Sequence, residues 1–142
     1  MAKNITLMGA DYPDVPAVQL PQTGGGTAIF YDIDIDFGEG TVQSGRGTIE
    51  SGGCYKYGKI VCMNVVILST YSAINEPGIY TCPNGFKPKS TGAVTVVESS
   101  NINPGTTTGT KQAGRITTDG NVYCEKMESG KYYTVSGCWM TD

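Results

Sequence analysis

The clearest alternation of hydrophobic and polar positions lies between residues 27 and 37. Apolar side chains at the odd positions from 29 to 37 alternate with aspartates at positions 32, 34 and 36. Successive side chains of a strand point to opposite faces of a sheet, so this pattern predicts a β-strand with one buried face and one acidic face. The spaced carboxylates also suit Ca²⁺, but the glycine stands at the seventh rather than the sixth position of an EF-hand loop, and Gln43 stands at the twelfth. We therefore expect a strand and no metal site.

Short β-prone runs separated by turn residues follow along the rest of the chain. We expect strands over residues 54–57, 60–68, 79–82, 93–98, 115–118, 121–126, 132–135 and 138–140. Many short strands with regular turn signals are typical of a β-sandwich or a jelly roll. The predicted fold class is all-β, a jelly-roll-like β-sandwich head with an extended N-terminal arm and strand.

Two local signals support this prediction. Asp119 and Gly120 separate two β-prone runs, which predicts a hairpin with a type I′ turn. Pro83 and Pro88 flank a segment that contains Gly85, and neither proline can donate a backbone hydrogen bond. We expect a rigid loop there. A second, longer loop is expected over residues 101–112.

The first residues have a different composition from the rest. Prolines at 13, 16 and 21 exclude a helix and a central strand, and residues 23–26 resemble a hinge. Residues 38–53 are rich in glycine, and we interpret them as a connector. The expected division is an arm for attachment or oligomer contacts over residues 1–45, and a β-sandwich head over residues 46–142.

Charge and cysteine content exclude several classes of function. The formal net charge is −3, only 16% of residues are charged, and no basic stripe is present, so we expect no nucleic-acid partner. The longest apolar run, residues 60–68, is too short to span a bilayer, and the first residues do not form a signal peptide. Five cysteines without CxxC spacing, and the absence of histidine, argue against zinc. Reduced thiols are expected, and a disulfide between two of them stays open.

No motif indicates catalysis. Without histidine, the usual general base and the Ser-His and Cys-His dyads are absent. No phosphate-binding glycine loop is present, and no particular pair of carboxylates suggests a glycosidase. We expect neither an enzyme nor a cofactor.

Aromatic residues near turns supply the candidate binding residues. Most tyrosines fall in or next to predicted strands, where core or subunit packing explains them. Tyr71, Tyr132 and Tyr133 adjoin turn-like sequence, and an aromatic face can stack on a sugar ring. These three are the candidates for a saccharide-binding surface.

Four segments resemble, in the same order, parts of the head domains at the C-terminus of many phage tail-fibre and receptor-binding proteins. Residues 54–61 look like the opening strand pair of that family, and residues 83–90 look like its proline-flanked turn. Residues 114–122 are similar to its Asp-Gly hairpin, and residues 136–142 are similar to its closing strand. Residues 5–13 also look like the start of small tail proteins of phages and prophages.

The resemblance implies a jelly-roll-like head, usually a homotrimer, that binds a saccharide or another receptor on the bacterial surface. It implies an N-terminal part that docks onto other tail or baseplate proteins, in a virion tail assembled in the host bacterial cytoplasm. Only residues 38–53 stand in the place of a long shaft, which favours a short baseplate or tail-tip protein. The binding residues of the family vary with the host, so none is transferred to this chain. The alternatives are a purely structural tail or baseplate component and, more weakly, a depolymerase-like enzyme.

Overall fold

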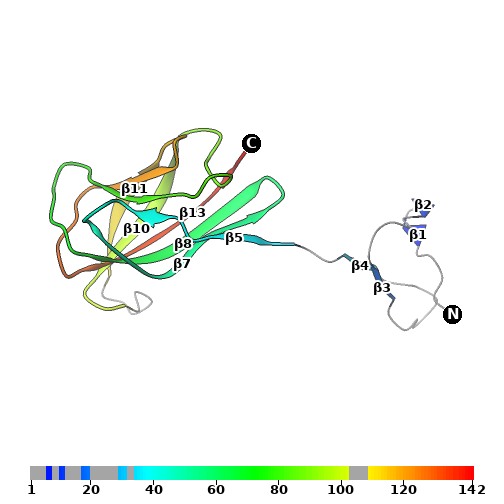
Figure 1. The fold of residues 1–142 in the computed structure, drawn as a ribbon, viewed down its shortest axis with the longest axis horizontal. Coiled ribbons are helices and arrows are strands. Elements are labelled where there is room, and N and C mark those ends of the chain that lie inside the picture. The colour runs from blue at the N-terminus through cyan, green and yellow to red at the C-terminus, as the bar shows by residue number, and fades with distance from the viewer. Residues whose placement is uncertain (1–5, 8–9, 12–16, 20–28, 32–33, 103–108) are drawn as a thin grey trace. The chain divides into compact units, whose positions relative to one another are not determined.

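The computed structural model describes residues 6–7, 10–11, 17–19, 29–31, 34–102 and 109–142 (Figure 1). The chain divides into two compact units, residues 1–34 and residues 35–142. Across these described ranges the chain forms strands and turns, and none of it is a helix long and apolar enough to cross a membrane. The prediction of an all-β fold is confirmed.

The described residues of the first unit form two short antiparallel strand pairs. β1 (Thr6–Leu7) pairs with β2 (Ala10–Asp11), and β3 (Ala17–Gln19) pairs with β4 (Ile29–Tyr31). Most of the first 33 residues of the arm expected over residues 1–45 fall outside the described residues.

The second unit is a curled sheet of nine antiparallel strands, which gives the expected sandwich-like architecture. Its strands are β5 (Asp36–Gly38), β6 (Thr41–Val42), β7 (Gly47–Tyr57), β8 (Ile60–Ser69), β9 (Gly78–Thr81), β10 (Gly92–Ser99), β11 (Thr110–Ile116), β12 (Asn121–Cys124) and β13 (Tyr132–Met140). They lie in the order β5-β7-β8-β13-β10-β11-β12-β9-β6.

The core lies on the inner face of this sheet. In β8 every second side chain from Val61 to Ser69 is buried, and the others are exposed or half-buried, as the period of two of a strand requires. The buried hydrophobic residues are Cys54, Val61, Met63, Val65, Ile67, Ile79, Tyr80, Cys82, Val94, Val96, Ile116, Val122, Cys124, Met127, Tyr133 and Val135. Nearly every strand of the sheet contributes to this one cluster, so it is the main source of stability of the unit.

β13 follows every other strand in the sequence and yet lies in the middle of the sheet. It pairs with β8 over nine residues on one side, from Tyr132↔Leu68 to Met140↔Ile60, and with β10 on the other (Figure 1). Two separate strands were expected over residues 132–135 and 138–140, but the structure has one. Gly137 continues the strand because its Cα packs closely on β10, where a Cβ would lie 2.8 Å from Val94 Cγ1.

The hairpin at Gly120 is confirmed, although its turn type was predicted wrongly. Ile116 pairs with Val122, and the Gly120 N–H donates to the carbonyl of Thr117 at 2.8 Å. Gly120 has φ +84°, but Asp119 is not among the residues with positive φ, as a type I′ turn would require. The Thr117 N–H also donates to the carbonyl of Asn121 at 3.0 Å, so residues 118–120 form a three-residue loop in which only Gly120 adopts the left-handed conformation.

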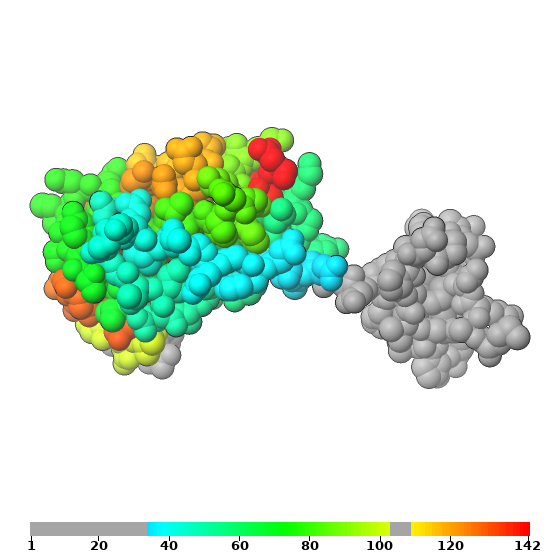
Figure 2. Space-filling model, viewed as in Figure 1, coloured from blue at the N-terminus to red at the C-terminus, as the bar shows by residue number. Residues whose placement is uncertain are grey.

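The connector expected over residues 38–53 is wrong. β6, most of β7 and the end of β5 lie in this segment, and Figure 2 shows these residues (cyan to teal) packed along the body of the second unit. The glycines mark close approaches and a bulge rather than a flexible linker: the β7–β8 register shifts between Ile49 and Ser51, next to Gly52. The second compact unit therefore includes this segment, since it begins at Ile35.

The strand expected over residues 27–37 is also divided. β4 ends at Tyr31 and β5 begins at Asp36, while residues 32–33 fall outside the described residues. Ile35 and Phe37, which were expected to be buried, are 62% and 54% exposed. β5 is an edge strand that pairs only with β7, so its outward apolar side chains have no covering layer within the described part of this chain.

Candidate functional site

A cavity of about 480 Å³ opens beside the loop that joins β8 to β9. Three separate segments line it: the turn between β6 and β7, this loop, and β12. The lining residues are Gln43, Arg46, Tyr71, Ala73, Ile74, Asn75, Glu76, Pro77, Gly78 and Tyr123. Its volume falls within the range that is usual for small-molecule sites, about 300–1,000 Å³. We call it the tyrosine cavity.

Backbone contacts hold the loop in place. Ala73 forms an isolated antiparallel bridge with Met127, with both N–H···O bonds at 2.8–2.9 Å. The Glu76 N–H donates to the carbonyl of Glu125, and Glu76 has φ +43°, the only positive value among the described non-glycine residues. Such a conformation persists only where surrounding contacts impose it, and it often marks a functional loop.

Arg46 fixes one aromatic ring of the cavity. Its guanidinium carbon lies 5.0 Å from the centre of the Tyr71 ring, and its Nη1 donates to the carbonyl of Gly78. The Tyr71 N–H donates to Ser69 Oγ at 3.2 Å. The ring and the cation thus stand in a defined geometry at the rim of the cavity, with Tyr71 38% exposed.

A second arginine–tyrosine pair includes Tyr123, which also lines the cavity. Arg115 on β11 stands directly across from Tyr123 on β12, with its guanidinium carbon 5.0 Å from the ring centre. Arg115 also forms an exposed ion pair with Glu76 at 3.5 Å. A smaller hollow of about 180 Å³ adjoins this pair. Exposed ion pairs contribute little to stability. This one therefore serves mainly to orient the polar groups of Arg115 and Glu76 at the surface.

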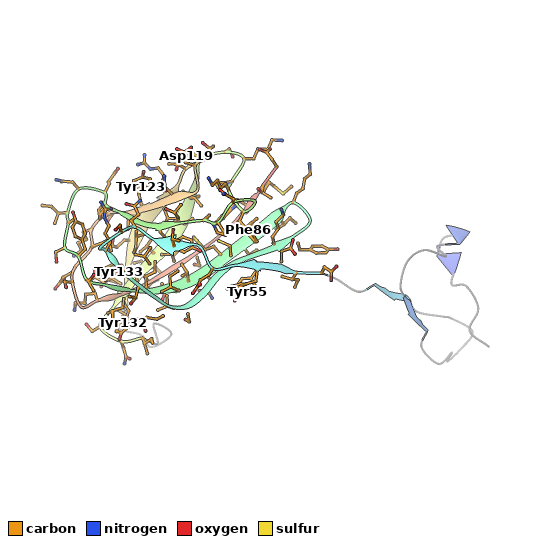
Figure 3. All side chains as sticks on the ribbon, in the orientation of Figure 1. Tyr55, Phe86, Asp119, Tyr123, Tyr132 and Tyr133 are labelled. Atoms are coloured by element: carbon orange, nitrogen blue, oxygen red, sulfur yellow. The ribbon has the colours of Figure 1, made fainter. Side chains whose placement is uncertain are left out.

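The structure separates the three tyrosines that the sequence indicated. Tyr71 lines the tyrosine cavity. Tyr133 is fully buried, and its hydroxyl accepts the N–H of Glu128 and donates to Glu98, so it cannot contact a receptor. Tyr132 is half-buried on the outer face of β13 opposite Leu68, and Figure 3 labels it at the other side of the ribbon from Tyr123.

Sequence reasoning missed Tyr123, although a signal was present. Once the loop at Gly120 joins the two strands, residues 116 and 122 face each other, and the next pair outward is Arg115 and Tyr123. The hairpin therefore places a cation beside an aromatic ring on one face of the sheet. No comparable local signal existed for Gln43 or Arg46, because they reach the cavity from a distant turn.

The loop flanked by Pro83 and Pro88 has a structural role. Trp139 Nε1 donates to the carbonyl of Phe86 at 2.8 Å, and Lys56 Nζ donates to the carbonyl of Gly85 at 3.0 Å. Phe86 packs against the core. The Cys82 N–H bonds the carbonyl of Gly120, which joins the start of this loop to the β11–β12 hairpin. The two sequence signals therefore meet in space.

The outer face of the sheet forms a second notable surface. The outward side chains of β8 and β13 carry no charge: Ile60, Cys62, Asn64, Val66, Leu68, Tyr132, Thr134, Ser136, Cys138 and Met140. Ile35, Phe37, Tyr55 and Tyr57 adjoin them and are exposed, and the Phe37 and Tyr55 ring centres lie 5.1 Å apart. We call this surface the uncharged face.

Within the described ranges there is no group of three or more His, Cys, Asp or Glu residues that could hold a metal ion.

A scan against protein-family models and a search of the curated proteins each found no match to this chain.

Proposed function

We propose that the protein is a receptor-binding component of a phage or prophage tail or baseplate, and that its β head recognises a saccharide on the host cell surface at the tyrosine cavity. The observation that carries the proposal is the cavity itself, in which Tyr71 and Tyr123 are each oriented by an arginine. The ordered resemblance of four sequence segments to phage tail heads supplies the biological context.

The chemistry of the lining supports a saccharide. Sugar rings present apolar C–H faces that pack on aromatic rings, and hydroxyls that need hydrogen-bond partners at the edges. The cavity offers two tyrosine rings, the amides of Gln43 and Asn75, and the carboxylate of Glu76. A few convergent polar groups around an aromatic wall are typical of an orienting site.

The remaining parts of the proposal concern assembly and location. We propose a homotrimer that acts without catalysis or a cofactor, with the N-terminal unit attached to other tail or baseplate proteins. The protein would be assembled in the host bacterial cytoplasm and act in the virion tail. The separate unit of residues 1–34 is compatible with an attachment role.

Replacing Tyr71 or Tyr123 by alanine is expected to weaken binding to host cell-wall polysaccharide about tenfold, since an aromatic contact contributes on the order of 1 kcal/mol. Adsorption of the purified protein to host cells, with soluble polysaccharide as competitor, measures the effect. The matched control is Tyr132→Ala, which removes a tyrosine outside the cavity and should bind as the wild type does while native mass measurement shows the same oligomer. Thermal unfolding of each variant establishes that it is folded.

Two outcomes would contradict the proposal. Equal loss in all three tyrosine variants would mean that the cavity has no special part in binding. Failure of the wild type to adsorb to any strain that the phage infects would exclude receptor binding altogether.

A purely structural tail or baseplate role is the second candidate, and the uncharged face favours it. Contiguous exposed apolar surface on a soluble protein commonly marks a contact with another protein. Phe37, Tyr57, Ile60 and Met140 are all about half exposed on this face or beside it. If the head is packed against tail proteins there, the same fold serves assembly.

Native mass measurement is expected to show a stable trimer, and Ile60→Lys on the uncharged face is expected to shift the protein toward the monomer. A charge placed in an apolar interface loses its hydration without gaining a partner. The control is Ile74→Lys, because Ile74 is 80% exposed and lies away from this face. A wild-type monomer would count against the trimer, and dissociation by both substitutions would count against this face as the contact.

A further inference from the structure

Cys62 and Cys138 lie directly opposite each other on neighbouring strands. Cys62 is in β8 and Cys138 is in β13, and the register pairs them. Both thiols are exposed, on the uncharged face of the sheet. They are separated by more than half of the sequence, so only the central placement of β13 brings them together.

The hydrogen-bond pattern shows which kind of cross-strand pair they form. In an antiparallel ladder, opposite residues alternate between hydrogen-bonded and non-hydrogen-bonded pairs. The Ser69 N–H donates to the carbonyl of Lys131 at 2.9 Å, and the Thr141 N–H donates to the carbonyl of Lys59 at 2.8 Å. Both bonds join odd-numbered residues at the two ends of this ladder. Even-numbered pairs, including Cys62 with Cys138, are therefore non-hydrogen-bonded.

That position suits a direct link between the side chains. Opposite Cα atoms of a non-hydrogen-bonded pair are about 4.5 Å apart, with their side chains closer together than in the other kind of pair. Disulfides span Cα separations of about 4.4–6.8 Å. The two cysteines can therefore be bridged without displacement of either strand.

The pKa of Cys138 agrees with a second sulfur atom close by. The adjacent Cys62 thiol raises the pKa of Cys138 above its usual value, and burial contributes less. The other close pair, Cys54 and Cys82, has its sulfurs 3.7 Å apart. Those residues are only 0% and 3% exposed, so a reagent in solution does not reach them in the folded protein.

We propose that Cys62 and Cys138 form an oxidative modification site, at which a small-molecule disulfide converts the two thiols into a cross-strand disulfide. One cysteine thiolate attacks a sulfur of the reagent, forms a mixed disulfide and expels one small thiolate. The second cysteine thiolate attacks the protein-bound sulfur and expels the other. The protein loses two protons and two electrons, and the reagent is reduced to two thiols.

The bond would fasten two strands that are far apart in the sequence. A cross-link that closes a long loop restricts the unfolded chain, and on this account the thermal midpoint should rise by on the order of 10 °C. A protein that is made in a reducing compartment and later meets an oxidising medium would become more resistant to unfolding. The inference rests on the sheet geometry and holds whether or not the protein binds a receptor, and it applies to chains whose uncharged face is not packed against another protein.

Incubation of the full chain with oxidised glutathione at pH 8 tests the proposal. The expected product is a single chain without a disulfide to another chain, about 2 mass units lighter under denaturing conditions, as loss of two hydrogen atoms requires, with a Cys62–Cys138 cross-link in peptide maps made without reduction. Its thermal midpoint should return to the starting value after reduction. Cys62→Ser and Cys138→Ser change exposed residues and should each stop at a glutathione adduct.

The proposal would be overturned by a wild-type product that carries only glutathione adducts, by disulfide-linked pairs of chains, or by a map that joins Cys54 to Cys82. It would also be overturned if the link formed only after denaturation. A cross-link without any rise in the thermal midpoint would contradict the claim that the disulfide stabilises the folded protein.

Discussion

Replacement of Gly52 by alanine is expected to lower the free energy of unfolding by about 3–5 kcal/mol, the range of the most destabilising single substitutions. Gly52 has φ +80°, and a Cβ at this position would lie 2.0 Å from the carbonyl oxygen of Asn64 on β8. The next contacts are also with backbone atoms, which cannot rotate away. Alanine can fit only if β7 and β8 separate where the bulge lies. Urea unfolding followed by circular dichroism measures the loss.

Gly58→Ala is the matched control. Gly58 lies in the turn of the same hairpin with φ +58°, but its added Cβ would meet no atom within 4 Å. The backbone conformation alone should then cost about 1–2 kcal/mol. The difference between the two variants isolates the close approach of β7 to β8. Equal losses would show that the strands are not in such contact at Gly52.

The unfolding free energy is expected to fall by several kcal/mol between pH 8 and pH 11. Burial raises the pKa of Cys124 from 9.0 to about 11. Burial also raises the pKa of Tyr80 and of Tyr133 above the usual value of 10.0, and for Tyr133 the neighbouring Glu98 adds to the effect. All three groups hold their protons more tightly in the folded chain than in the unfolded chain.

The sign follows from this difference in proton binding. Between the unfolded and folded pKa of Cys124 the folded state binds more protons, so its stability declines as the pH rises. The contribution is fully present below pH 9 and is lost on passing through pH 11, with a value of about 3 kcal/mol for this group. The buried tyrosines begin to contribute above pH 10.

Urea unfolding at one-unit pH intervals measures this decline, and Cys124→Ala provides the comparison. That variant should flatten the curve between pH 9 and pH 11 while losing little at pH 8, because the side chain is small. A curve of unchanged slope would assign the alkaline loss to other groups.

Strands and turns could be predicted from the sequence wherever the residues of one short segment determine them. β8 could be predicted from a short run of apolar, mostly β-prone residues that follows a turn, and the Gly120 hairpin from one dipeptide between two strands. Tyr132 and Tyr133 could have been separated by alternation: Val135 is in phase with Tyr133, whereas Thr134 and Ser136 are in phase with Tyr132. Periodicity therefore determined strand faces within a single element.

The sequence did not determine which face would be covered. The alternation around Ile35 and Phe37 is regular, but burial depends on what packs against the strand, and β5 lies at an edge. Glycines in residues 38–53 were equally ambiguous, because a flexible linker and a tight approach both require them. The tyrosine cavity was not predictable as a whole, since its walls come from three segments joined only by the fold.

The central position of β13 also affects how the chain reaches its native state. During synthesis, β8 and β10 emerge well before their shared partner, so the hydrogen-bonding edges that face β13 stay open until the ribosome has passed Met140. Non-local pairing of this kind slows folding, and open strand edges recruit other chains. Neighbouring nascent chains translated from one messenger RNA are therefore most prone to associate wrongly just before β13 leaves the ribosome. Chaperone protection is most needed at that stage.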